Sequence, residues 1–248
     1  MTQQELEETL RALFATETDA ARSVLSEPRD ANTAVKLAVR AGQRAQRTFL
    51  PVFQTVACKP GCGFCCRGVR VDVTAPEALT IARGFRETLP AAQLAIIRDR
   101  VERHAAKLRA MTLEERRREG TPCPLLDEVT NLCSVHDARP MRCRAHHSLD
   151  VADCKAASLH PEKPASIVRY PDVMNGHEAM ILGQKRALAA AGLDARAFDL
   201  TLGLDVALTH DDAAERWARG ERLFDAAVFT WSDEQRPAES ELPRILLG

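Results

Sequence analysis

The stretch CKPGCGFCC (Cys58–Cys66) places four sulfur atoms within nine residues. Core packing does not explain this density, because a cysteine that serves as a small hydrophobic residue usually occurs singly. Gly61 and Gly63 let the backbone turn back on itself, so several thiolates can face one centre while nearby amides donate to the sulfurs. The stretch therefore predicts a metal-binding or redox loop, and the rest of the fold is expected to support it.

Four further cysteines follow at regular intervals, with nine, nine and ten residues between successive members. These gaps are too long for one local loop. The fold must therefore return these cysteines to the first cluster, or they form a separate site. All eight cysteines are candidate metal ligands: Cys58, Cys62, Cys65, Cys66, Cys123, Cys133, Cys143 and Cys154.

The spacing of the cysteines discriminates between the two common thiolate-bound metals. Paired C-x2-C knuckles are typical of structural zinc, but only Cys62 and Cys65 form such a pair. A compact run completed by a remote cysteine that precedes a proline, as Cys123 precedes Pro124, is closer to iron–sulfur ligation. The predicted cofactor is therefore an iron–sulfur cluster, with Zn2+ as the next choice.

The composition limits the compartment and the partners. The chain has 248 residues, with 34 Lys and Arg against 35 Asp and Glu, so it lacks the positive charge of a general nucleic-acid binder. The acidic N-terminus does not resemble a signal peptide, and no apolar run is long enough for a membrane span. We expect a cytoplasmic protein whose partner, a protein or a small molecule, is unidentified, and in that reducing compartment thiols favour metal or redox chemistry over disulfides.

The chain outside the cysteines predicts a mainly α fold with minor β, a helical domain carrying two cysteine-rich loops around a metal centre. We expect an N-terminal helical pair (1–54), a cysteine-cluster core (55–160) and a C-terminal helical extension (161–248) that packs on the core, and the size of the chain predicts that the three form one compact domain. Helix starts are predicted at the caps Thr2, Asp30, Thr74, Thr112 and Asn175, and further helices at 90–110, 199–209 and 211–219. Pro51 should end the second helix, and short strands are expected at 68–74 and 166–170.

The run Cys58–Cys66 is followed later in the chain by a second motif that begins at Cys133 and ends at Arg144. Together, and in this order, the two motifs resemble the YkgJ-type cysteine-cluster family, also called the CxxCxxCC or zinc- or iron-chelating domain. The first is Cys58–Cys66, in which three residues separate Cys58 from Cys62 where the family name has two. The second, CSVHDARPMRCR (Cys133–Arg144), is similar to C-x-[IV]-[YH]-x-x-R-P-x-x-C-R. The resemblance covers about residues 55–155. It implies metal chelation by cysteines without a settled reaction, and flagellin lysine methylases carry a similar cysteine motif.

Arginines and histidines accompany the second motif. Arg139, Arg142 and Arg144 flank Cys143, and we predict that they contact an anionic thiolate-bound cofactor; the alternative is a solvated basic loop or a buried ion pair. His136, His146 and His147 could ligate a metal, but the cysteines already exceed four positions. Surface or supporting positions are therefore expected for His146 and His147, and no catalytic residue is assigned.

Three functions remain open. The first is a cysteine-ligated metal-binding protein of unassigned reaction. The second is an S-adenosylmethionine-linked methyl-transfer or radical enzyme, because Cys58, Cys62 and Cys65 also fit a C-x3-C-x-aromatic-C spacing, although the βα repeats of a barrel are missing. The third is a redox or metal sensor acting through Cys65 and Cys66.

Overall fold

Two long antiparallel helices begin the chain in this computed structural model, which describes residues 2–163, 166–228 and 246. Helix α1 (Gln3–Leu25) starts at the predicted capping box of Thr2 and Glu5. Helix α2 (Asn32–Phe53) starts where the Asp30 carboxylate accepts a hydrogen bond from the Asn32 amide at 2.8 Å. The predicted end at Pro51 is wrong, because Val52 and Phe53 pack against a buried cluster and keep the last turn helical.

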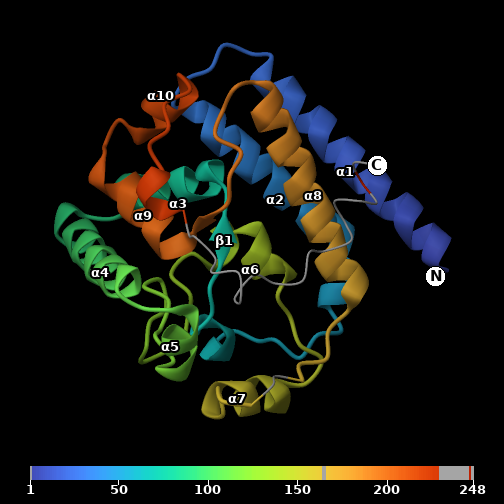
Figure 1. Ribbon diagram of the computed structural model, residues 1–248, viewed down its shortest axis with the longest axis vertical. Coiled ribbons are helices and arrows are strands. Elements are labelled where there is room, and N and C mark those ends of the chain that lie inside the picture. The colour runs from blue at the N-terminus through green and yellow to red at the C-terminus, as the bar shows by residue number, and fades with distance from the viewer. Residues whose placement is uncertain (1, 164–165, 229–245, 247–248) are drawn as a thin grey trace.

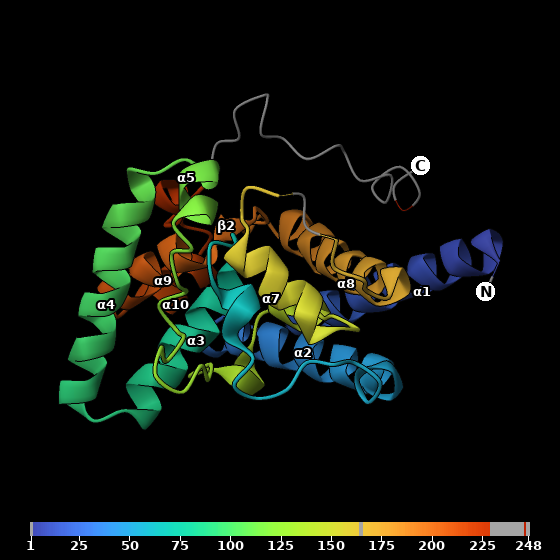
Figure 2. The same ribbon diagram turned by 90° about the horizontal axis from the view of Figure 1, so that it is seen from below.

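Helix α8 (Pro171–Ala190) lies along α1, as both views show (Figures 1 and 2). It begins four residues before the predicted Asn175, because Pro171 with its fixed φ takes the first helical position. Gly192, at φ +70°, terminates this segment as expected. The helices approach closely at Gly183, where the Thr18 hydroxyl bridges the carbonyls of Phe14 and Gly183 at 2.8 and 3.2 Å.

Alanine at Gly183 is expected to destabilise the protein. Its Cβ would lie 2.5 Å from the backbone oxygen of Phe14, which cannot move without separating the two helices. Such overpacking costs about 1–3 kcal/mol. Gly84 is the matched control, because it is also helical and nothing lies within 4 Å of its added Cβ; Gly84→Ala should stabilise by about 0.5–1 kcal/mol. Urea denaturation measures both, and equal responses would refute the close approach.

The main hydrophobic core lies where the C-terminal ends of α1 and α8 and the start of α2 meet four further helices (Figure 1). It is built around α3 (Ala75–Thr88), α4 (Ala91–Arg109), α9 (Leu200–Thr209) and α10 (Ala213–Ala218). Trp217 and Phe224, predicted as core residues, are completely buried. The capping boxes at Thr74 and Thr112 are present, the second opening α5 (Leu113–Arg118).

The described residues contain one small sheet, in which β1 (Asp72–Val73) pairs antiparallel with β2 (Phe198–Asp199). The first strand is shorter than the predicted 68–74. The strand predicted at 166–170 is wrong: this segment is irregular, and the Tyr170 amide donates to the His147 ring at 2.7 Å instead of to a strand. The mainly helical fold class is confirmed, and residues 229–245 of the predicted C-terminal extension lie outside the described residues.

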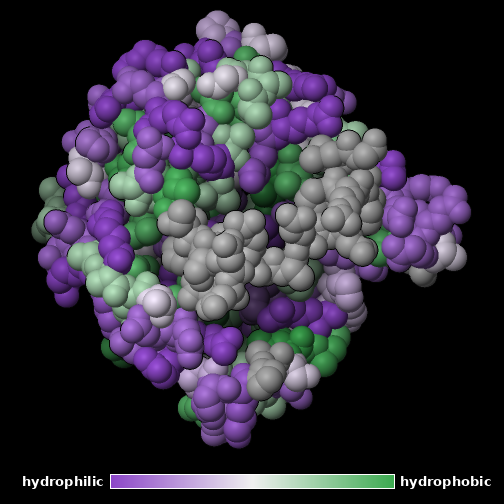
Figure 3. Space-filling view, in the orientation of Figure 1, coloured by the Kyte–Doolittle hydropathy of each residue, from purple (hydrophilic) through white to green (hydrophobic). Residues whose placement is uncertain are grey.

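Short elements carry most of the cysteine region. They are η1 (Gly63–Cys66), η2 (His136–Ala138), α6 (Met141–Ala145) and α7 (Val151–Leu159), followed late in the chain by η3 (Asp225–Ala227). None of the described helices is long and apolar enough to span a bilayer. The face seen in Figure 3 is mostly hydrophilic, with apolar side chains in scattered patches.

Candidate metal centre

The first cysteine loop folds into a tight turn. Gly61 adopts φ +84°, a conformation that glycine reaches without strain, and Gly63 opens the 3-10 turn η1. A Cβ on Gly63 would lie 3.0 Å from the Asn131 side chain, so the second cysteine loop packs directly on this turn. Cys65 and Cys66 are adjacent in this turn, and their thiols interact electrostatically.

The remote cysteines return to this turn. The Cys123 amide donates to the Cys66 carbonyl at 2.7 Å, and Cys133 forms a backbone bridge with Leu126. Helix α6 carries Cys143, and α7, which packs on η1, carries Cys154. Of the two arrangements that the spacing allowed, the structure has the one in which the fold brings the later cysteines back to the first cluster.

Electrostatic interactions link six of the thiols into two groups. Cys62 interacts electrostatically with Cys58, Cys65 and Cys154. Cys143 interacts with Cys123, Cys65 and Cys133. We call Cys58, Cys62 and Cys154 the outer group, and Cys123, Cys133 and Cys143 the inner group. Cys65, of the vicinal pair Cys65–Cys66, interacts with a member of each group.

Desolvation keeps these thiols protonated. It raises the pKa of Cys123 to about 12, and it raises the pKa of Cys133 and Cys143. The hydrogen bond from Cys66, followed by burial, raises the pKa of Cys65. Thiolates are the form that binds a metal, so metal uptake at this site would displace protons.

The donor set fits zinc or iron, although its arrangement is not yet that of a bound site. Cysteine sulfurs are the preferred ligands of Zn2+ and of iron–sulfur clusters. Within residues 2–163, 166–228 and 246, no three potential ligands stand close enough together to coordinate one ion. Metal binding would therefore draw the thiols of each group together, and Cys58 is exposed at the edge of its group.

The three predicted arginines differ in their surroundings. Burial raises the pKa of Cys58, Cys133 and Cys143, and the Cys66 interaction followed by burial raises that of Cys65; the charge of Arg139 partly offsets each rise, so it acts on both groups. Arg142 instead pairs with Glu178 of α8. Arg144 donates to the carbonyls of Arg139 and Asp137 and thereby fixes the loop before α6.

The histidines of the second motif have structural surroundings. His136 is exposed beside Asp137. His147 is 1% exposed, so of the two expected positions, surface or supporting, it does not have the surface one. Its Nδ1 faces the Ala145 carbonyl at 2.8 Å, and its Nε2 accepts from the Tyr170 amide. The ring therefore ties the segment before α8 to the end of α6. Burial lowers the pKa of His146 to about 4.

His177, on α8, is expected to make stability depend on pH. It is buried and stacks on Phe49 at 4.4 Å, and this desolvation lowers its pKa to about 4. The folded pKa lies below the unfolded value near 6.5, so the stabilisation is complete above about pH 6.5 and is lost as the pH falls toward 4. The loss approaches about 3 kcal/mol. Urea denaturation of wild type and His177→Phe at pH 7 and 4.5 measures it; parallel losses in both proteins would contradict this role.

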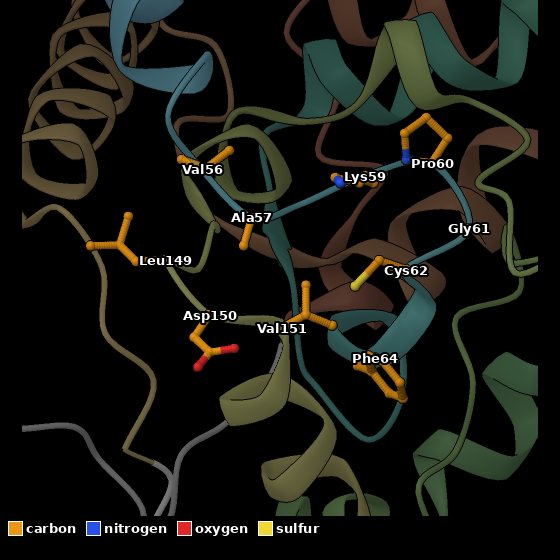
Figure 4. A pocket seen from close by; sticks show the side chains of 10 residues that line it. All are labelled: Val56, Ala57, Lys59, Pro60, Gly61, Cys62, Phe64, Leu149, Asp150 and Val151. Atoms are coloured by element: carbon orange, nitrogen blue, oxygen red, sulfur yellow. The ribbon is translucent and has the colours of Figure 1, made fainter.

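A pocket of about 660 Å³ adjoins the outer group (Figure 4). Its walls come from the first cysteine loop and from the start of α7. The Cys62 sulfur points into it, and most of the other side chains are apolar. The lining residues are Val56, Ala57, Lys59, Pro60, Gly61, Cys62, Phe64, Leu149, Asp150 and Val151.

Two features near the cysteines had no signal in the sequence. One is this pocket, whose walls are about 90 residues apart in the chain. The other is the buried ion pair of Arg116 with Asp199 at 2.6 Å, both of which act electrostatically on Cys123. In the sequence, Arg116 is one of three consecutive arginines in a short helix. Only the tertiary fold brings it to Asp199.

Comparison with known proteins agrees with the geometry of the site. The sequence model of one family, CxxCxxCC, described as "Putative zinc- or iron-chelating domain", matches residues 57–180. This match contains all eight cysteines and half of the chain. No curated protein and no solved structure gave a significant match. The chain therefore belongs to the CxxCxxCC family of zinc- or iron-chelating domains.

Proposed function

We propose that this protein binds metal at two four-thiolate centres, which share the cysteines of the η1 turn. The outer group supplies three thiolates to one centre and the inner group supplies three to the other. One member of the Cys65–Cys66 pair completes each set. Iron–sulfur clusters are the leading candidates and zinc ions are next, and the protein works in the reducing cytoplasm, where its thiols stay free.

The observation that carries this proposal is the return of the remote cysteines to the first loop. Five separate segments contribute the eight thiols, and backbone contacts such as that of Cys123 with Cys66 fix their approach. Eight thiols exceed the needs of one tetrahedral ion or one cubane cluster, whereas two centres use all of them. Arg139 supports both centres, because a four-thiolate centre is anionic.

Anaerobic purification followed by metal and sulfide analysis tests the proposal. Iron–sulfur centres would give iron with equimolar acid-labile sulfide and visible charge-transfer absorption. Structural zinc would give two ions per chain and no visible absorption. A protein that emerges without iron or zinc, and takes up neither when reconstituted under reducing conditions, would refute metal binding.

A redox or metal sensor is the second candidate, and the adjacent, electrostatically interacting thiols of Cys65 and Cys66 favour it. Oxidation there would remove the fourth ligand from each centre at once. Mass spectrometry after mild peroxide treatment tests this function. A sensor should oxidise at this pair first and release its metal, whereas oxidation that begins elsewhere would contradict the assignment. The described residues show no barrel to support the radical-enzyme alternative.

A further inference from the structure

The pocket beside Cys62 has walls that are already fixed to each other. The Ala57 amide donates to the Ser148 carbonyl at 2.9 Å, which joins the first cysteine loop to the segment before α7. The Ser148 hydroxyl in turn donates to the Asp150 carbonyl at 2.6 Å and accepts from the Asp150 amide at 3.1 Å. Ser148 is completely buried, so the contact that joins these two walls lies inside the fold.

The pocket carries one charge of each sign. Lys59 and Asp150 both line it, and neither takes part in an ion pair described for this structure. Asp150 uses Oδ1 to accept from the Ala152 amide and cap α7, which leaves its other oxygen available. Side chains of opposite charge in one pocket fit a zwitterion, whose carboxylate would face Lys59 and whose ammonium group would face Asp150.

The third polar group is a soft donor. Figure 4 shows the Cys62 sulfur directed toward the space between Ala57 and Val151. Cys62 belongs to the outer group, so any molecule in the pocket has direct access to that candidate centre. The volume of about 660 Å³ accommodates a free amino acid or a short peptide.

We propose that this pocket receives a small zwitterionic thiol, cysteine or a short peptide of it, which carries a metal ion to the outer centre. The inference rests on the proposed metal-binding function and adds the route of loading. In the transfer step the bond between the metal and the carrier sulfur breaks and one to the Cys62 sulfur forms. The proton of the Cys62 thiol passes to the carrier thiolate, and no oxidant or reductant is needed.

The experiment compares carriers on the metal-free, reduced full chain. Zinc is supplied as the sulfate, as its complex with L-cysteine, or as its complex with cysteamine, which keeps the thiol and the amine but lacks the carboxylate. Native mass spectrometry follows the rate of zinc incorporation. The variants are Lys59→Gln, Asp150→Asn, which retains an N-cap of equal quality, and the control Lys155→Gln, an exposed lysine on α7 outside the pocket lining.

We expect wild type to load about threefold to fivefold faster from zinc–cysteine than from zinc–cysteamine, the upper end of the effect that an exposed charge pair gives. Lys59→Gln should abolish that difference. Asp150→Asn should slow both carriers, and Lys155→Gln should behave as wild type. Loading from zinc sulfate should be equal in all four proteins.

The two possible failures are distinguishable. If wild type binds zinc from the sulfate but shows no preference for zinc–cysteine, or if Lys59→Gln keeps that preference, the carrier pocket is refuted and the metal site stands. If wild type binds no zinc from the sulfate, the proposed function itself fails. Equal slowing in Lys155→Gln and Lys59→Gln would also overturn the inference, because it would indicate a general charge effect.

Discussion

Serine in place of Cys143 is expected to empty the inner centre and leave the outer one loaded, so that bound metal falls by about half. The serine hydroxyl is a poor ligand for zinc and iron at neutral pH, whereas its volume is close to that of cysteine. Cys143 interacts with Cys123 and Cys133, so its loss leaves that group with two thiols. Cys62→Ser should have the converse effect, because Cys62 belongs with Cys58 and Cys154.

Metal-to-protein ratios of anaerobically purified variants measure this prediction. Ser134→Ala is the control, because Ser134 lies in the same loop as Cys133 and its hydroxyl bonds only to the Leu125 carbonyl within the described contacts. It should retain the full metal content. A single centre shared by all the cysteines would lose its metal in both Cys62→Ser and Cys143→Ser, and that outcome would refute the division into two groups.

The double variant Cys62→Ser with Cys143→Ser separates ligand loss from unfolding. It should bind no metal, while circular dichroism shows that the helices remain, because the main core lies among α3, α4, α9 and α10. Loss of helix in the double variant would instead mean that the centres are needed for folding.

Local signals predicted most of the helices, and long-range contacts decided the errors. The capping boxes at Thr2, Thr74 and Thr112 involve residues three apart, so the sequence contains the whole interaction. The segment 166–170 alternates like a strand, but a strand needs a partner, and the His147 ring occupies its Tyr170 amide. For the same reason the sequence identified the cysteines but did not show which ones lie together.

The supports of the site were also beyond local reasoning. Arg116 and Asp199 are 83 residues apart in the chain. Nothing in the run Leu113–Arg118 distinguishes Arg116 from the arginines beside it, because exposure is the ordinary condition of a charged residue on a short helix. Only the tertiary fold, which places Arg116 against Asp199 of β2, buries this one side chain.

Methionine in place of Arg116 is expected to destabilise the protein by about 3–5 kcal/mol, which is the typical cost of removing one partner from a buried ion pair. Both side chains of the pair are almost completely buried, with exposed fractions of 9% and 2%. The Asp199 carboxylate also accepts from the amides of Thr201 and Leu202 to cap α9, so it cannot turn toward solvent without losing that cap. Without Arg116 it would remain buried as an uncompensated charge.

Two further variants test this explanation against a general effect of losing an arginine. Arg103→Met breaks the exposed pair with Asp99 and should change the free energy of unfolding by less than about 1 kcal/mol. Asp199→Asn in the Arg116→Met background removes the stranded charge and keeps a good helix cap, so it should restore most of the stability. If urea denaturation shows no restoration, the loss comes from packing and not from the charge. Restoration would show that the charge interaction of Arg116 with Asp199 joins α5 to the start of α9. Both residues also act electrostatically on Cys123, so this contact would support the inner group at a place that no local sequence signal marks.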